Sequence, residues 1–105
     1  MTTYRELLAQ VKEEISEIDA RQLADELATA QPPLLIDVRE PDEYEQGAIL
    51  EAVHIPRGFL ESRIEATAPD KGQRIVLSCA SGARSAFGAK ALAEPTSFTA
   101  ATLHV

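Results

Sequence analysis

An apolar run that leads into a turn of small residues constrains the fold of this 105-residue chain most strongly. The run, Arg74–Ser78, predicts a buried β-strand, and residues 86–94 predict a helix. The turn between them, Cys79–Ser85, contains the single cysteine of the chain. A strand that passes directly into a helix is a unit of the α/β folds, so we expect a mostly parallel sheet with helices on both faces.

The turn favours negative charge at the cysteine. In such a turn several backbone N–H groups point at one spot, and the helix that follows directs the positive end of its dipole there. Both effects favour the thiolate form of Cys79 and suit an anionic substrate. The alternative is that Cys79 is a small buried apolar side chain without chemical function, but Gly82 and Arg84 within the turn argue against it.

A second apolar run, Leu34–Val38, predicts a central parallel strand that is covered on both faces. Asp37 and Arg39 lie at its carboxyl end, where the sites of open parallel sheets form. Their pattern favours a structural ion pair or a hydrogen bond that braces a loop. Asp42 and Glu43 follow in a helical turn begun by Pro41, and we interpret these acids as a solvated face.

The remaining elements follow from apolar spacing and turn residues. Residues 3–14 predict an amphipathic helix that packs against the domain or pairs with a second copy of the chain in a homodimer. Asp19 is the expected N-cap of the next helix. The other expected elements are an edge strand at 15–18, helices at 20–30 and 58–66, and strands at 53–55 and 98–105.

Composition excludes several classes of protein. The formal net charge of −7 argues against a nucleic-acid partner. Residues 71–105, which contain the cysteine, carry four basic residues and one acidic residue, whereas residues 1–70 carry 6 and 16. A single cysteine excludes an intrachain disulfide. No run has the length or flanks of a membrane span or signal peptide, so a cytoplasmic location is expected.

Two motifs carry a resemblance to a known family. Cys79–Ser85 resembles the active-site loop of the rhodanese sulfurtransferases, and Leu35–Tyr44 resembles the other signature of that family. Ala48 stands where the family usually has a histidine, and Glu51 stands where it usually has a glycine. The resemblance implies a three-layer α/β domain over residues 15–105, preceded by a helical extension at 1–14. The family's tryptophan-bearing last helix is expected to be missing, because the sequence has no tryptophan.

The resemblance implies transfer of a sulfane sulfur from a small anionic donor, such as thiosulfate, to a thiol or to cyanide through a Cys79 persulfide. It implies a substrate-binding loop in which Arg84 holds the donor and braces the loop, while Asp37 and Arg39 support it. Arg63 either reaches the mouth of the site or pairs with Glu61 or Glu65. No cofactor is implied, and the isolated histidines predict no metal site. The loop consists of Cys79, Ala80, Ser81, Gly82, Ala83, Arg84 and Ser85.

Two other functions compete with sulfur transfer. The related cysteine phosphatases have a loop one residue longer than the Cys-x4-Arg spacing found here, and the shorter loop fits a sulfur atom better than a phosphate. Rhodanese-like modules also serve as non-catalytic binding or regulatory domains. Such modules usually lose the cysteine, which this chain keeps.

Overall fold

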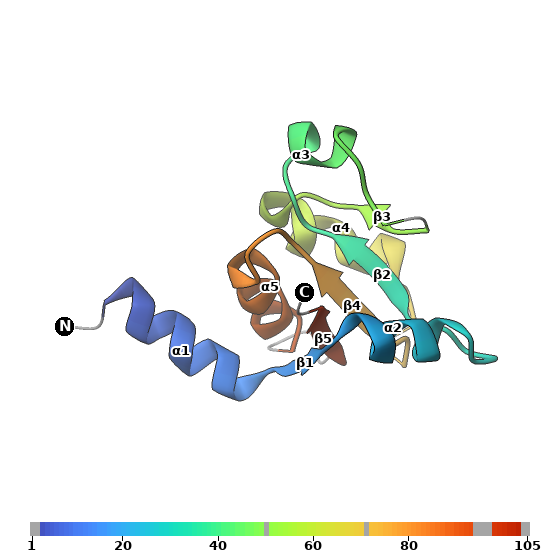
Figure 1. Ribbon diagram of the computed structural model, residues 1–105, viewed down its shortest axis with the longest axis horizontal. Helices are drawn as coiled ribbons and strands as arrows, with labels where there is room; N and C mark the ends of the chain where they lie inside the picture. The colour runs from blue at the N-terminus through green and yellow to red at the C-terminus, as the bar shows by residue number, and fades with distance from the viewer. Residues whose placement is uncertain (1–2, 50, 71, 94–97, 104–105) are drawn as a thin grey trace.

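The protein folds around a five-stranded parallel sheet (Figure 1). A computed structural model describes residues 3–49, 51–70, 72–93 and 98–103. In spatial order the strands are β1 (Ser16–Ile18), β5 (Ala100–Leu103), β4 (Ile75–Ser78), β2 (Leu34–Asp37) and β3 (Val53–His54). Every described strand pair is parallel, which confirms the predicted class of fold.

The two apolar runs of the sequence lie side by side at the centre of the sheet. Asp37 of β2 is in register with Ser78 of β4, and the Val38 N–H donates to the Ser78 carbonyl at 2.9 Å. The carboxyl ends of both strands therefore lie next to each other. The two sequence motifs, which follow these strands, are brought to the same edge of the sheet.

Helices cover the sheet in two outer layers. On one face, Leu23 of α2 (Ala20–Leu27) packs in a cluster with Leu35 and Val76. On the other face, α4 (Leu60–Thr67) and α5 (Ala83–Ala93) pack over Ile36 and Leu77. Alternate strand residues thus face opposite layers, as the period of a β-strand requires. A 3-10 turn (Arg57–Phe59) precedes α4.

Local sequence signals explain where the helices begin. Asp19 caps α2 as predicted, because its carboxylate accepts from the Gln22 N–H at 2.8 Å and the Gln22 side chain accepts from the Asp19 N–H at 2.8 Å. Pro41 opens the short helix α3 (Pro41–Glu45). Helix α5 begins at Ala83, three residues earlier than predicted, because the Ala86 N–H already donates to the Gly82 carbonyl at 3.1 Å.

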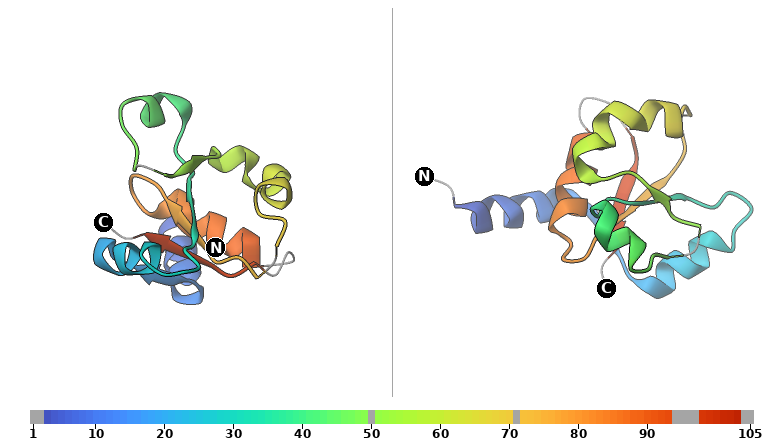
Figure 2. Two further views of the ribbon diagram at one scale, coloured as in Figure 1. Left: turned by 90° about the vertical axis from the view of Figure 1, so that its right-hand side faces the viewer. Right: turned by 90° about the horizontal axis from the view of Figure 1, so that it is seen from above.

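The N-terminal helix α1 (Tyr4–Glu14) packs against α5, although its first turn projects away from the sheet (Figure 2). Val11 is buried, and the Tyr4 and Phe87 rings lie 6.1 Å apart between centroids. The contact with α5 agrees with the first of the two roles expected for the helix, and its pairing with a second copy stays a prediction. Within the described ranges, no helix has the length and apolar character that a membrane crossing requires. The predicted helix end at 94–95 and the last two residues of the predicted strand at 98–105 lie outside the described residues.

Candidate active site

The Cys79 sulfur lies inside the turn between β4 and α5. Cys79 is 8% exposed, and its Sγ accepts from the Gly82 N–H at 3.1 Å and from the Ser85 N–H at 3.4 Å. The sequence predicts backbone donors within this turn, and the structure identifies those of Gly82 and Ser85. Ala80 and Ser81 are exposed on the outer side of the turn. The turn therefore surrounds the sulfur with backbone donors, which stabilise negative charge on it.

Gly82 gives the turn its shape. Its φ of 84° lies in the left-handed region, where a side chain strains the backbone. In this conformation its N–H points at the Cys79 sulfur, while its carbonyl accepts from Ala86 and opens α5. One glycine thus both directs a donor at the sulfur and starts the helix.

Ser85 is fully buried beside the sulfur. Its hydroxyl donates to the Gly82 carbonyl at 3.2 Å and accepts from the Cys79 thiol at 3.3 Å. The hydroxyl therefore faces the loop and ties the sulfur to the Gly82 carbonyl that precedes α5.

Arg84 points at a carboxylate from another element. Its two terminal nitrogens donate to Glu43 Oε1 and Oε2 at 2.6 Å and 2.9 Å. The hydrogen bonds from Arg84 lower the pKa of Glu43 from its usual 4.5 to about 2, and the same contact raises the pKa of Arg84. The predicted solvated face is wrong for Glu43, which is half-buried and ties α3 to the cysteine loop. This geometry supports the bracing role of Arg84, whereas its hold on a donor anion stays a prediction.

Asp37 and Arg39 form the structural ion pair that the sequence favoured. Arg39 Nη2 donates to Asp37 Oδ2 at 2.7 Å and to the Gly47 carbonyl at 2.7 Å. Burial raises the pKa of Asp37, but hydrogen bonds and charge from Arg39 outweigh it and hold that pKa below its usual value. The Arg39 carbonyl lies 2.8 Å from Nε2 of His54, whose ring stacks on Tyr44. The pair fixes the loop that carries Glu43 rather than facing the sulfur.

Arg63 lies apart from this cluster. Its guanidinium stacks over the Phe59 ring at 4.4 Å from the centroid, on the outer side of α4. The contact given for Arg63 is thus with Phe59, and its role at the mouth of the site stays a prediction. Ala83 is half-buried at the first position of α5, where it completes the small-residue wall of the turn.

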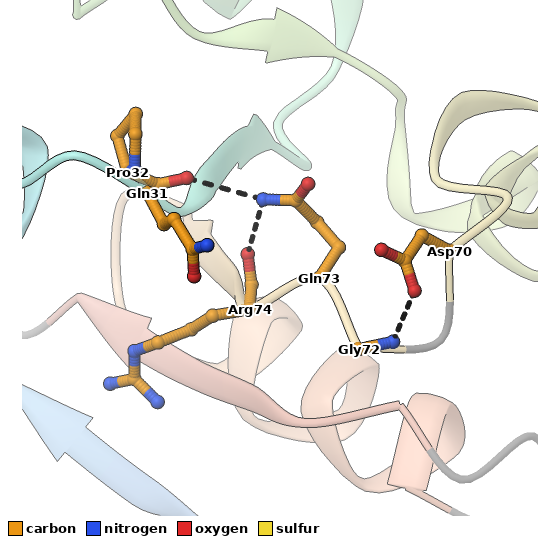
Figure 3. Close-up of a pocket in the computed structure, with 6 residues that line it drawn as sticks. All are labelled: Gln31, Pro32, Asp70, Gly72, Gln73 and Arg74. Carbon is orange, nitrogen blue, oxygen red and sulfur yellow. Dashed lines mark hydrogen bonds between the residues drawn. The ribbon is translucent and has the colours of Figure 1, made fainter.

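A surface pocket of about 520 Å³ lies at the opposite edge of the sheet (Figure 3). Gln31, Pro32, Asp70 and Gly72 line it, together with Gln73 and Arg74 just before β4. Arg74 is already paired with Glu26, and the Gln73 amide donates to the Pro32 carbonyl at 3.2 Å. Several of its polar groups are thus already engaged with protein partners, and the pocket lies at the opposite end of β4 from Cys79. The described ranges bring no three potential metal ligands together.

The arrangement of fold and cysteine loop defines a family. Residues 19–103 match the model of the rhodanese-like domain, so the chain belongs to the rhodanese-like domain family. The match begins just before α2 and therefore leaves out α1.

Individual relatives agree with this assignment. The chain is 37% identical over 71 residues to a sulfurtransferase of Allochromatium vinosum, a match that covers 68% of this chain and 64% of the relative. The thiosulfate sulfurtransferase of Pseudomonas aeruginosa superposes with a TM-score of 0.81 at 25% identity, over 92% of this chain and 19% of that one. A Rhodopseudomonas palustris protein of unknown function, described as a possible tyrosine phosphatase, superposes with a TM-score of 0.80 at 25% identity, over 99% and 87%.

The site also contains residues that sequence reasoning missed. Glu43 lies 41 positions from Arg84, and no local pattern announces their contact. The only signal was the Glu40–Glu43 spacing of a helix start, which does place the Glu43 carboxylate against the Glu40 N–H at 2.9 Å. Because that contact is local, it says nothing about a partner in the cysteine loop.

Proposed function

We propose that this protein is a sulfurtransferase in which Cys79 carries the transferred sulfur atom. The observation that supports this most directly is the pair of backbone N–H groups, from Gly82 and Ser85, that donate to Cys79 Sγ. Donors fixed in this way stabilise an anionic sulfur before and after it gains a second sulfur atom. The names of the relatives as sulfurtransferases point to the same chemistry.

In the first half-reaction the Cys79 thiolate attacks the outer sulfur of thiosulfate. The new S–S bond forms as the bond between the outer sulfur and the sulfonate sulfur breaks, and sulfite leaves with the bonding electron pair. The protein keeps a persulfide anion. The thiolate and thiosulfate together carry a charge of −3, and so do the persulfide and sulfite. No proton or external oxidant is needed.

In the second half-reaction an acceptor removes the outer sulfur. Cyanide attacks it, forms thiocyanate and returns Cys79 as a thiolate. A thiol acceptor attacks in the same way as its thiolate, after loss of its proton to solvent, and leaves as a persulfide anion. The terminal sulfur of the Cys79 persulfide occupies the space enclosed by residues 80–84. Ser85 and the Arg84–Glu43 pair keep the turn in its cradle shape while the sulfur charge moves outward.

Phosphate hydrolysis is the competing chemistry, and it is the activity suggested for the Rhodopseudomonas palustris neighbour. The short spacing between Cys79 and Arg84 favours a sulfur atom over a phosphate group. The pairing of Arg84 with Glu43 also occupies the two terminal guanidinium nitrogens that would bind a phosphate group in a bidentate manner.

The test is steady-state thiocyanate formation from thiosulfate and cyanide, beside hydrolysis of p-nitrophenyl phosphate. We expect turnover of thiosulfate, loss of that turnover in Cys79→Ser, and no phosphate release above the level of Cys79→Ser. Cysteine-dependent phosphate release without thiocyanate formation would reverse the assignment. Thermal melting of Cys79→Ser serves as the control for folding.

A further inference from the structure

A lysine from outside the family match lies at the cysteine loop. The point where a Cβ on Gly82 would stand is 3.9 Å from Lys12 Nζ, and no other non-neighbouring atom lies within 4 Å of it. Because the Gly82 N–H donates to Cys79 Sγ at 3.1 Å, bond lengths place Lys12 Nζ within about 10 Å of the sulfur. The ammonium therefore borders the open space next to Gly82, whose N–H donates to the reactive sulfur.

Lys12 has no carboxylate partner in the described part of the chain. The residues three and four positions away in the sequence are Leu8, Ala9, Ile15 and Ser16, and none of these is acidic. Arg84 and Arg39, by contrast, are each paired with a carboxylate. The positive charges of Arg84 and Arg39 are thus largely neutralised, whereas that of Lys12 is not.

The docking of α1 holds Lys12 in this place. Tyr4 packs on Phe87 near the start of the helix, Val11 is buried, and Glu14 pairs with Lys90 of α5 at its end. These contacts fix the backbone on both sides of Lys12, which is itself half-buried. A bound ligand would therefore have to position only the free end of the Lys12 side chain.

We propose that Lys12 is a substrate-binding residue that pairs with the anionic sulfonate group of the sulfur donor. The inference rests on the proposed sulfur transfer. While the outer sulfur of the donor contacts Cys79, the sulfonate must lie toward solvent, and the open space beside Gly82 is bordered by the Lys12 ammonium. The ion pair between Lys12 and the sulfonate contributes to donor binding before the S–S bond forms. Lys12 therefore acts mainly on KM. It also selects donors by charge, because a dianion gains more from it than a monoanion.

The test compares four proteins: wild type, Lys12→Met, Lys12→Arg and Arg5→Gln. Lys12→Met keeps the length of the side chain and removes the charge, whereas Lys12→Arg keeps the charge. Arg5 is exposed on the same helix, so Arg5→Gln is the control for the loss of one positive charge from α1. Each protein is assayed with thiosulfate, a dianion, and with benzenethiosulfonate, a monoanion, at low and high ionic strength.

We expect Lys12→Met to raise KM for thiosulfate about tenfold, the scale of one hydrogen bond to a charged group, with kcat nearly unchanged. The increase should be smaller for benzenethiosulfonate, and kcat/KM should lose part of its dependence on ionic strength. Lys12→Arg should restore most of the affinity, and Arg5→Gln should match wild type. Melting temperatures check that α1 stays docked.

Three results would count against the proposals, and each points to a different failure. If wild type turns over and Lys12→Met matches Arg5→Gln with both donors, the role of Lys12 is refuted and the sulfur transfer stands. If wild type turns over neither donor, both proposals fall. A fall in kcat with unchanged KM would likewise contradict a binding role for Lys12.

Discussion

Replacement of Gly82 by alanine tests whether the shape of the cysteine loop depends on one backbone conformation. Gly82 has φ = 84°, and the only atom near the position of a new Cβ is Lys12 Nζ at 3.9 Å, an ordinary contact. Steric overlap therefore contributes little. The cost is the left-handed backbone, which disfavours alanine by about 1–2 kcal/mol.

That cost has two measurable consequences. If the loop keeps its shape, Gly82→Ala should lower the melting temperature by about 5–10 °C for a domain of this size. If the loop relaxes to negative φ, the Gly82 N–H turns away from Cys79 Sγ. Loss of one hydrogen bond to an anionic sulfur then lowers the rate of sulfur transfer about ten- to hundredfold.

Differential scanning calorimetry and the thiocyanate assay, applied to the same samples, measure both quantities. Gly82→Asn should retain more stability than Gly82→Ala, because asparagine tolerates the left-handed region better. Gly58 offers a matched control: its φ is not positive and no atom lies within 4 Å of its Cβ position, so Gly58→Ala should melt at or above the wild-type temperature. A Gly82→Ala protein with wild-type melting and wild-type turnover would refute the reasoning.

Two further predictions concern stability. Because the pKa of Glu43 falls from 4.5 to about 2 in the folded protein, its pair with Arg84 should stabilise fully above pH 4.5 and be lost as pH falls toward 2. The difference in urea midpoint between wild type and Glu43→Gln should shrink over that window; a difference that stays constant down to pH 2 would contradict the pairing. Gly88→Val should lower the unfolding free energy by about 1–3 kcal/mol, since even a Cβ meets the buried Leu77 and Leu60 at 3.0 Å and 3.1 Å. Gly88→Ala gains about 1 kcal/mol of helix propensity, which offsets its tight Cβ contacts, so this variant should melt near wild type. Equal melting of Gly88→Val and Gly88→Ala would show that the core can adjust.

The sequence could predict what depends on near neighbours in the chain. The strands β2 and β4 follow from short apolar runs, and the capping of α2 follows from Asp19 and Gln22. The position of Cys79 between a strand and a helix is equally local. These features are set by periodicity, capping and turn chemistry, which act over a few residues.

Contacts between distant residues could not be predicted in this way. The partner of Arg84 is Glu43, and Lys12 reaches a loop 70 positions away, because the packing of α3 and α1 decides both contacts. Arg63 shows that a local contact can be missed as well: its place on a predicted helix was right, but its guanidinium stacks over the ring of Phe59, four residues earlier, and not on the glutamates considered. A charged side chain several bonds long reaches many partners, and only the tertiary structure selects one.

The most direct test of the central claim is the intact mass of the protein after incubation with thiosulfate, with Cys79→Ser as the control. The account predicts that wild type gains one sulfur atom, that Cys79→Ser gains none, and that cyanide removes the added atom as thiocyanate. A folded wild-type protein that gains no sulfur, or a Cys79→Ser protein that gains as much as wild type, would contradict the assignment of Cys79 as the sulfur carrier.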